Sequence, residues 1–207
     1  MMRILFQGDS VTDAGRNREN TALGGRGYAT MVSAKLGFEY PGEYEFMNRG
    51  ISGNRVVDLL ARMKADIINL QPDVMSILIG VNDVWHEFNF QNGTGTELYE
   101  QFYNILIGEV KAALPDIRMI IMEPFVLKGT ETTKYWPAIG EEVRKKAAAA
   151  RRVAEKNQLE FIPLQDKFDA ALKLAPEEYW LRDGVHPSAA GHELIAREWI
   201  RTFLGEK

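Results

Sequence analysis

Four short segments of the chain carry groups that could together perform nucleophilic catalysis. Gly8-Asp9-Ser10 directly follows a short apolar run, and Asp183 and His186 lie three residues apart near the C-terminal end. A serine hydroxyl is a poor nucleophile unless a base takes its proton during attack. An imidazole can act as that base when a carboxylate fixes its other nitrogen as the donor. The sequence therefore predicts Ser10 as nucleophile, His186 as its base and Asp183 as the group that orients His186.

The other two segments, residues 48–54 and 80–83, offer hydrogen-bond donors for the same reaction. Attack on a carbonyl carbon gives a tetrahedral intermediate whose negatively charged oxygen needs donors already aimed at it. We predict that the backbone N–H groups of Ser10 and Gly53 and the side-chain amide of Asn82 form this oxyanion hole. Gly53 has no Cβ, so a substrate can approach its backbone, and Asn82 donates without adding charge.

Each segment also has a structural interpretation when taken alone. Asp183-Gly184 is typical of a turn, Gly53 of a loop, and Asn82-Asp83 of a helix N-terminus. A binding module without catalysis is therefore one alternative. Reaction with a serine-directed phosphonate would exclude this alternative, and absence of reaction would favour it. A binder needs neither a base nor the carboxylate that orients it. The convergence of all roles favours catalysis.

Alternating apolar runs and helix-period segments indicate how these groups are positioned. We expect strands over residues 4–7, 45–48, 74–79, 119–122 and 159–162, and helices over residues 28–36, 56–63, 98–114, 139–157 and 189–204. This alternation predicts an α/β fold, a three-layer α/β/α sandwich with a five-stranded parallel sheet, in a single domain over residues 1–207. Segments that follow strands then meet at one edge of the sheet, where ligands bind.

Three details of this organisation can be checked directly. The buried face of the helix over residues 98–114 is expected to contain Leu98, Phe102, Ile105, Leu106, Val110 and Leu114. Ser188 is expected to cap the last helix. Residues 15–27 and 128–140 are expected to form loops, and loops of this length in a compact domain are often functional.

Composition excludes several classes of function. The chain of 207 residues has a net charge of −4 and no block of Lys or Arg, which argues against nucleic-acid and anionic-membrane partners. It has no cysteine, so a thiolate nucleophile or Cys-based zinc site is excluded. No His, Asp or Glu spacing indicates a metal site, and we expect no cofactor. No apolar run is long enough for a signal peptide or a membrane span, so we expect a cytoplasmic location. Homo-oligomerisation stays open.

The segments together resemble the SGNH hydrolases, also called the GDSL family of esterases and lipases. The resemblance rests on Gly8-Asp9-Ser10, Gly53, Asn82 and Asp183-x-x-His186 in the family's order, with Val11 where the family usually has Leu. It implies a flavodoxin-like sheet and the same triad and oxyanion hole. The fuller segments 8–13, 15–16, 27–28, 49–56, 79–85 and 185–192 resemble the intracellular xylan acetylesterase branch, which implies deacetylation of sugar oligomers.

Some neighbouring residues are candidates for other roles. Trp85, Trp180 and His86 lie next to the four segments and are expected to line a substrate site, since a flat aromatic surface suits a sugar face. Each of them has an alternative role in the core or on the surface. We expect a structural hydrogen bond from His192, and hydrogen bonds from Asp9 and Asp13 to loop N–H groups.

These observations favour a serine esterase that removes acetyl groups from xylo-oligosaccharides or related sugars. Its partner would be a small-molecule ester, an acetylated sugar. The alternative is an SGNH thioesterase or lysophospholipase that acts on long acyl chains. Long chains need an apolar groove, and no long apolar loop lies near the four segments. A series of esters of increasing acyl length would separate the two.

Overall fold

The central element is a parallel sheet, as the sequence predicted. The computed structural model describes residues 1–19 and 24–205. Within these residues, the sheet consists of β1 (Met2–Gly8), β2 (Tyr44–Asn48), β3 (Val74–Leu78), β4 (Arg118–Met122) and β5 (Glu160–Ile162). Their order is β2-β1-β3-β4-β5, with all neighbours parallel. This is the flavodoxin-like order.

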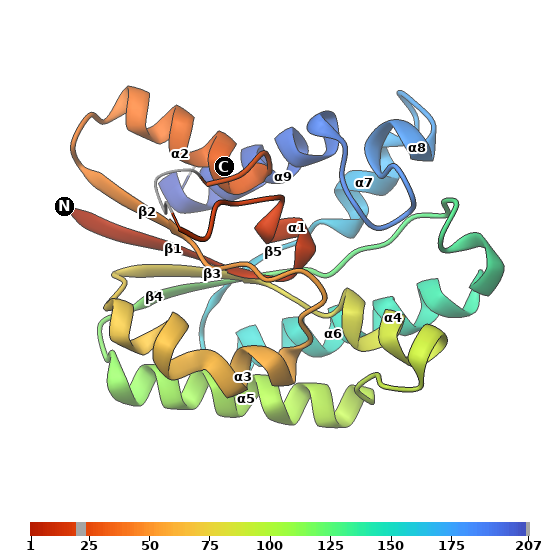
Figure 1. Cartoon of the computed structure of the whole chain (residues 1–207), viewed down its shortest axis with the longest axis horizontal. Coiled ribbons are helices and arrows are strands. Elements are labelled where there is room, and N and C mark those ends of the chain that lie inside the picture. Colours follow the sequence, from red (N-terminus) through yellow and green to blue (C-terminus); the bar gives the residue numbers. More distant parts are fainter. Residues whose placement is uncertain (20–23, 206–207) are drawn as a thin grey trace.

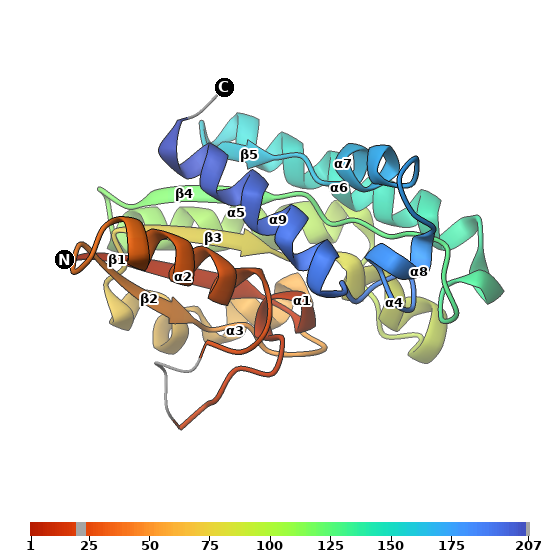
Figure 2. The same cartoon turned by 90° about the horizontal axis from the view of Figure 1, so that it is seen from above.

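Helices cover both faces of the sheet and complete the three layers (Figure 1). One face carries α2 (Tyr28–Glu39), α7 (Gln165–Ala171) and α9 (Ala189–Leu204), and the other carries α3 (Val56–Asp66), α5 (Thr96–Ala113) and α6 (Ala138–Lys156). From above, α2 and α9 lie side by side over the sheet (Figure 2). The predicted three-layer α/β/α sandwich is confirmed.

The apolar strand runs follow from burial on both faces. In β1, Ile4 and Phe6 belong to the core beneath α2 and α9, whereas Leu5 belongs to the core beneath α3 and α5. In β4, Ile120 and Ile121 divide in the same way between the two cores. Successive side chains of a strand point to opposite faces, so a strand covered on both sides must be apolar throughout.

The order of the strands brings the predicted site segments together. β1 lies between β2 and β3, with Phe6 paired to Asn48 and Gly8 paired to Leu78. The chain therefore leaves β1, β2 and β3 at the same edge of the sheet. Ser10 follows β1, with the loop that carries Gly53 on one side and the segment that carries Asn82 on the other.

The predicted inner face of α5 is wrong in part. Leu106 and Val110 are buried, but Leu98 and Ile105 are 45% and 50% exposed. Tyr99, Tyr103 and Ile107 are fully buried instead, on a face of the helix rotated from the predicted one. The prediction did not include either tyrosine. Burial of Tyr99 costs little because its hydroxyl donates to the carbonyl of Ile79 at 3.0 Å.

Four short helices were not expected from the sequence. They are α1 (Ser10–Asp13), α4 (Val81–Phe90), α7 and α8 (Glu177–Trp180). Ser188 caps α9 by accepting from the Gly191 N–H at 3.2 Å, as expected. The described part of the predicted loop over residues 15–27 contains no helix or strand before Tyr28, and residues 20–23 lie outside the described residues.

Candidate active site

The turn after β1 presents Ser10 at the edge of the sheet. The carboxylate of Asp9 accepts from the Val11 N–H at 3.0 Å and so caps α1, of which Ser10 is the first residue. Asp9 is 1% exposed, and burial raises its pKa to about 7 despite this hydrogen bond. Asp13, at the other end of α1, accepts from the Ser52 N–H at 3.1 Å. Asp13 thus binds a loop N–H group, as predicted, whereas Asp9 binds an N–H group in the first turn of α1.

Ser10, His186 and Asp183 form one chain of hydrogen bonds. Ser10 Oγ lies 2.9 Å from His186 Nε2, and His186 Nδ1 lies 2.7 Å from Asp183 Oδ2. The second carboxylate oxygen of Asp183 accepts from the backbone N–H groups of Val185 and His186, at 2.9 and 2.7 Å. This is the geometry that activates a serine hydroxyl, because the carboxylate fixes the imidazole tautomer.

The electrostatics of the pair suit a base. Burial of Asp183 opposes its charge, but hydrogen bonds from the His186 ring and from the His186 and Val185 N–H groups outweigh burial and lower the pKa of Asp183 to about 2. The same contact with Asp183 raises the pKa of His186 above its ordinary value, although burial acts in the opposite direction. Asp183 is therefore a carboxylate at neutral pH, and His186 titrates above the usual range.

The loop over residues 128–140, to which the sequence gave no role, holds Asp183 and Gly184 in place together with Leu127. The Leu127 N–H donates to the Gly184 carbonyl at 2.9 Å, and the Glu131 N–H donates to the Asp183 carbonyl at 3.1 Å. Buried Thr132 links Leu127 and Gly129 through its hydroxyl, at 2.8 Å from each partner. The predicted loop over residues 128–140, which includes a 3-10 turn at Thr133–Tyr135, thus supports the candidate triad.

The two other predicted oxyanion donors lie in adjacent loops. Gly53 has φ +82, which favours glycine, and no described atom lies within 4 Å of where a Cβ would stand. Asn82 is 8% exposed, and one of its amide hydrogens donates to the Asn54 carbonyl at 3.1 Å. The other hydrogen has no partner among residues 1–19 and 24–205. Asp83 joins α4 to α3 by accepting from the Val56 N–H at 3.1 Å.

A depression of about 560 Å³ opens beside Ser10 and His186 and is also lined by Arg26, Ser52, Arg182 and His192. We call it the Ser10 depression. Sequence reasoning did not assign Arg26 or Arg182 to the site, because nothing local links residue 26 to residue 182. His192 makes the structural hydrogen bond that was expected, since its Nδ1 accepts from the Tyr28 N–H at 3.2 Å.

The predicted aromatic residues do not line the Ser10 depression. Trp180 packs against the core beneath α2 and α9, and its indole N–H donates to the Ala175 carbonyl at 3.2 Å. Trp85 packs on a small core with Tyr135 and Trp136. His86 contacts Phe90 edge-on, with ring centroids 5.6 Å apart. A role for Trp85, His86 or Trp180 in substrate binding stays a prediction.

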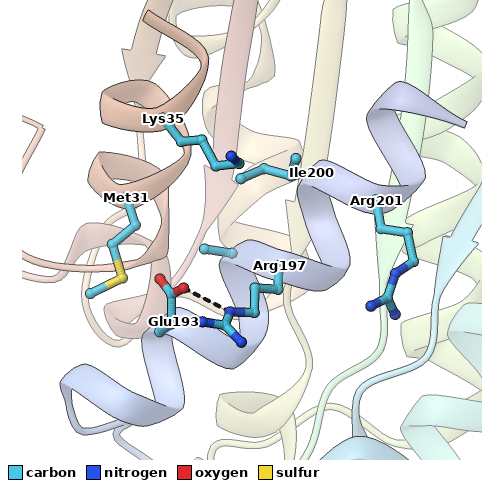
Figure 3. A pocket seen from close by; sticks show the side chains of 7 residues that line it. Met31, Lys35, Glu193, Arg197, Ile200 and Arg201 are labelled. Carbon is cyan, nitrogen blue, oxygen red and sulfur yellow. Dashed lines mark hydrogen bonds and ion pairs between the residues drawn. The ribbon is translucent and has the colours of Figure 1, made fainter. Parts of the chain in front are cut away.

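Another depression, of about 390 Å³, lies between α2 and α9 (Figure 3). Met31 and Ile200 are among its apolar residues, and Glu193 and Arg197 form an ion pair at 2.8 Å beside them. None of its lining residues belongs to the four sequence segments. Among the described residues, there is no cluster of three or more His, Asp or Glu side chains that could hold a metal ion, and no helix long and apolar enough to cross a membrane.

Comparison with known proteins gives the same family as the sequence motifs. The model of the GDSL-like lipase/acylhydrolase family matches residues 6–194. An acetylxylan esterase from Geobacillus stearothermophilus is 35% identical over 209 residues, covering 96% of this chain and 92% of that protein.

Solved structures extend this similarity to the fold. A structure described as a GDSL-like lipase, from Parabacteroides merdae, has a TM-score of 0.91 and 39% identity, covering 100% of this chain and 96% of that one. The structure of the Geobacillus stearothermophilus acetylxylan esterase has a TM-score of 0.86 and 34% identity, covering 97% and 93%. The chain therefore belongs to the GDSL-like lipase/acylhydrolase family and is a carboxylic ester hydrolase.

Proposed function

We propose that this hydrolase removes acetyl groups from acetylated xylo-oligosaccharides or related sugars, with Ser10 as nucleophile. The observation that carries the proposal is the hydrogen-bond chain from Ser10 Oγ through His186 to Asp183, with distances of 2.9 and 2.7 Å. The similarity to an acetylxylan esterase supports the acetyl-sugar substrate.

Variants of that relative support the assignment of the triad. Its solved catalytic mutants replace a serine, an aspartate and a histidine by alanine, and the aspartate and histidine lie three positions apart. Asp183 and His186 have the same separation. The relative is also described as an acetyl-xylooligosaccharide esterase, which matches the size of substrate proposed here.

The proposed mechanism uses the hydrogen bonds of His186 to Ser10 and Asp183. With Nδ1–H donated to Asp183, the other ring nitrogen of His186 accepts the Ser10 proton as Ser10 Oγ attacks the acetyl carbonyl carbon. His186 then gives this proton to the sugar oxygen as its bond to the acetyl carbon breaks, which leaves an acetyl-enzyme. Water then gives a proton to His186 and attacks the acetyl-enzyme, and His186 returns this proton to Ser10 Oγ as its bond to the acetyl carbon breaks and acetate leaves.

The proposed oxyanion hole consists of the Ser10 N–H, the Gly53 N–H and the Asn82 amide. Neither backbone N–H donates to another group in the described part of the chain. Donors without a protein partner are available to the oxygen of a tetrahedral intermediate, where they act on charge that develops during the reaction. The open space above Gly53 admits the substrate.

Two broader assignments complete the proposal. We infer that residues 1–207 form a single domain, which is supported by the packing of C-terminal α9 and N-terminal β1 in one core. We also propose a cytoplasmic location, which would restrict the substrate to oligomers small enough to enter the cell. It would be tested by fractionating the native cells.

The direct test is acetate release from acetylated xylo-oligosaccharides, other acetyl-sugars and phenyl acetate. Ser10→Ala should keep its circular dichroism spectrum and lose turnover by about a million-fold, as nucleophile removal does in subtilisin. A serine-directed phosphonate should label the native protein and not Ser10→Ala. Full esterase activity in a folded Ser10→Ala protein would show that Ser10 is not the nucleophile. If the native protein hydrolyses phenyl acetate but none of the acetylated sugars, the proposed acetyl-sugar substrate is wrong.

A further inference from the structure

The Ser10 depression is lined by cations and hydrogen-bond donors. Arg26 and Arg182 contribute guanidinium groups, and His192 contributes a ring nitrogen. Among the described residues that line it, none is Asp or Glu. The chain as a whole has a net charge of −4, so the positive charge of the residues that line this depression is opposite in sign to the net charge of the protein. A cluster of this kind favours an anionic ligand.

Both guanidinium groups are available to a ligand. The backbone of each arginine is anchored, because the Arg26 N–H donates to the Ala14 carbonyl at 3.0 Å and the Arg182 N–H donates to the His186 carbonyl at 3.0 Å. Neither side chain forms an ion pair or hydrogen bond within residues 1–19 and 24–205.

Other arginines near the site are engaged. Arg16 donates to the Gly50 carbonyl at 2.7 Å, and Arg62 pairs with Asp66 at 3.0 Å. Of these four arginines, the two without a described partner, Arg26 and Arg182, are therefore the two that line the Ser10 depression.

His192 adds a neutral donor to these charges. Its Nδ1 accepts the Tyr28 N–H, so the proton of the neutral ring is on Nε2. Burial, followed by the positive charges of Arg182 and His186, lowers the pKa of His192 to about 4, and the ring is neutral at pH 7. Arg182 also opposes protonation of His186, and Arg182, His186 and His192 all line the Ser10 depression.

The position of Arg182 differs in chemistry from the acetylxylan esterase of Geobacillus stearothermophilus. In that enzyme a tryptophan directly precedes the aspartate of a catalytic mutant, and the histidine of another lies three positions after the aspartate. Asp183 and His186 share this spacing, so Arg182 stands where the relative has tryptophan. An apolar aromatic surface is thereby replaced by a cation that can bind an anion bidentately.

We propose that the Ser10 depression binds a carboxylate on the alcohol portion of the ester, and that the preferred substrates are acetylated oligosaccharides that carry a uronic acid. This inference rests on the proposed function, since it assumes a sugar acetate. An acetyl group carries no charge, so the anionic group must lie on the part of the substrate that leaves with the alcohol. Arg26 and Arg182 would pair with the carboxylate, and His192 Nε2–H would donate to it or to a neighbouring hydroxyl.

The test compares two substrates that differ only in charge. One is acetylated xylobiose bearing a glucuronic acid, and the other is the same compound with the uronate converted to its methyl ester. The native protein should show a kcat/KM about three- to tenfold higher for the acid, as expected of two partly exposed ion pairs. This ratio should fall toward one as salt is raised from 0.01 to 1 M, because exposed charge pairs are screened.

Three variants locate the effect. Arg26→Gln and Arg182→Gln should each lower the acid-to-ester ratio. Arg197→Gln, which removes a paired arginine from the depression between α2 and α9, should keep the ratio of the native protein. Hydrolysis of both compounds at equal rates would overturn the anionic site and leave the acetylesterase proposal intact. Absence of hydrolysis of any acetate would overturn the proposed function itself.

Discussion

Gly129 packs against the backbone of Asp183 so closely that a Cβ at position 129 would stand 2.3 Å from the Asp183 carbonyl carbon. The contact joins the loop after β4 to the loop that carries the candidate triad. It explains why a residue 54 positions before Asp183 in the sequence constrains its orientation. Backbone atoms cannot move aside as a flexible side chain can, so any side chain at position 129 must displace Asp183.

Gly129→Ala should therefore lower kcat while changing KM little. A displacement of about 1 Å at a catalytic group costs on the order of a hundredfold in rate. Gly108→Ala is the matched control, since Gly108 lies on α5 and no described atom stands within 4 Å of its Cβ position. That control should raise the free energy of unfolding by about 1 kcal/mol and keep full activity.

Kinetics and thermal unfolding should be measured on both glycine variants. If Gly129→Ala unfolds, Thr132→Val gives a second route to the same loop, because it removes the hydroxyl that links Leu127 to Gly129. A native kcat in both folded variants would show that this loop does not position Asp183.

The contact between Gly129 and Asp183 also shows what could not be predicted from the sequence. The strands and the order of the motifs were predictable because burial on both faces imposes apolar runs that are visible locally. The assignment of Ser10 needed its residue type and its place after a strand, and that of Asp183 and His186 needed their residue types and their spacing of three before the last helix. The packing of Gly129 on Asp183 depends on how two distant loops meet, and no local pattern records it.

The same limit explains the error at α5 and the residues that were missed at the Ser10 depression. The predicted face of α5 contained aliphatic residues, whereas Tyr99 and Tyr103 are buried with ring centroids 5.6 Å apart. No sequence motif distinguishes Arg26 or Arg182, and only the fold brings both to the Ser10 depression. Trp85 and Trp180 were chosen for nearness in sequence to the motifs; they pack against the cores outside the Ser10 depression, and their role in substrate binding stays a prediction.

Asn82→Ala should reduce kcat by about a hundred- to thousandfold, the cost of removing one oxyanion donor. The effect should fall on kcat rather than KM because the amide acts on charge that exists only in the transition state. Its hydrogen bond to the Asn54 carbonyl holds the amide in place and leaves one hydrogen for the oxyanion. Steady-state kinetics on phenyl acetate decide this, and a change confined to KM would assign Asn82 to ground-state binding.

The acid limb of the pH–rate profile should lie above the ordinary histidine pKa. The hydrogen bond from His186 to Asp183 raises the pKa of His186, so the ring gains its proton and loses its function as base at a higher pH than usual. Arg182 acts in the opposite direction on the same pKa. Arg182→Gln should therefore move the limb to still higher pH, whereas Arg197→Gln should leave it unchanged.

This profile is measured as kcat/KM against pH with phenyl acetate, which is uncharged. The acid limb of kcat/KM reports the pKa of His186 in the free enzyme, and an uncharged substrate adds no charge effect of its own. A profile without an acid limb, measured with chemistry rate-limiting, would argue against His186 as base. A limb that moves to lower pH in Arg182→Gln would contradict the inference that the positive charge of Arg182 lowers the pKa of His186.

Short acyl groups should be preferred over long ones. Arg26, Arg182 and Ser52 line the Ser10 depression, and no Leu, Ile, Met or Phe is among its described lining residues. A full apolar groove gains up to about 0.8 kcal/mol for each buried methylene, and a polar wall forfeits most of this. The values of kcat/KM for acetyl, butyryl and octanoyl esters of one leaving group should therefore fall along the series. Acetylated xylobiose, run alongside, should release acetate. A rise toward the octanoyl ester, with no acetate from the sugar, would instead assign the protein to the thioesterases or lysophospholipases, because only burial of the acyl chain yields that trend.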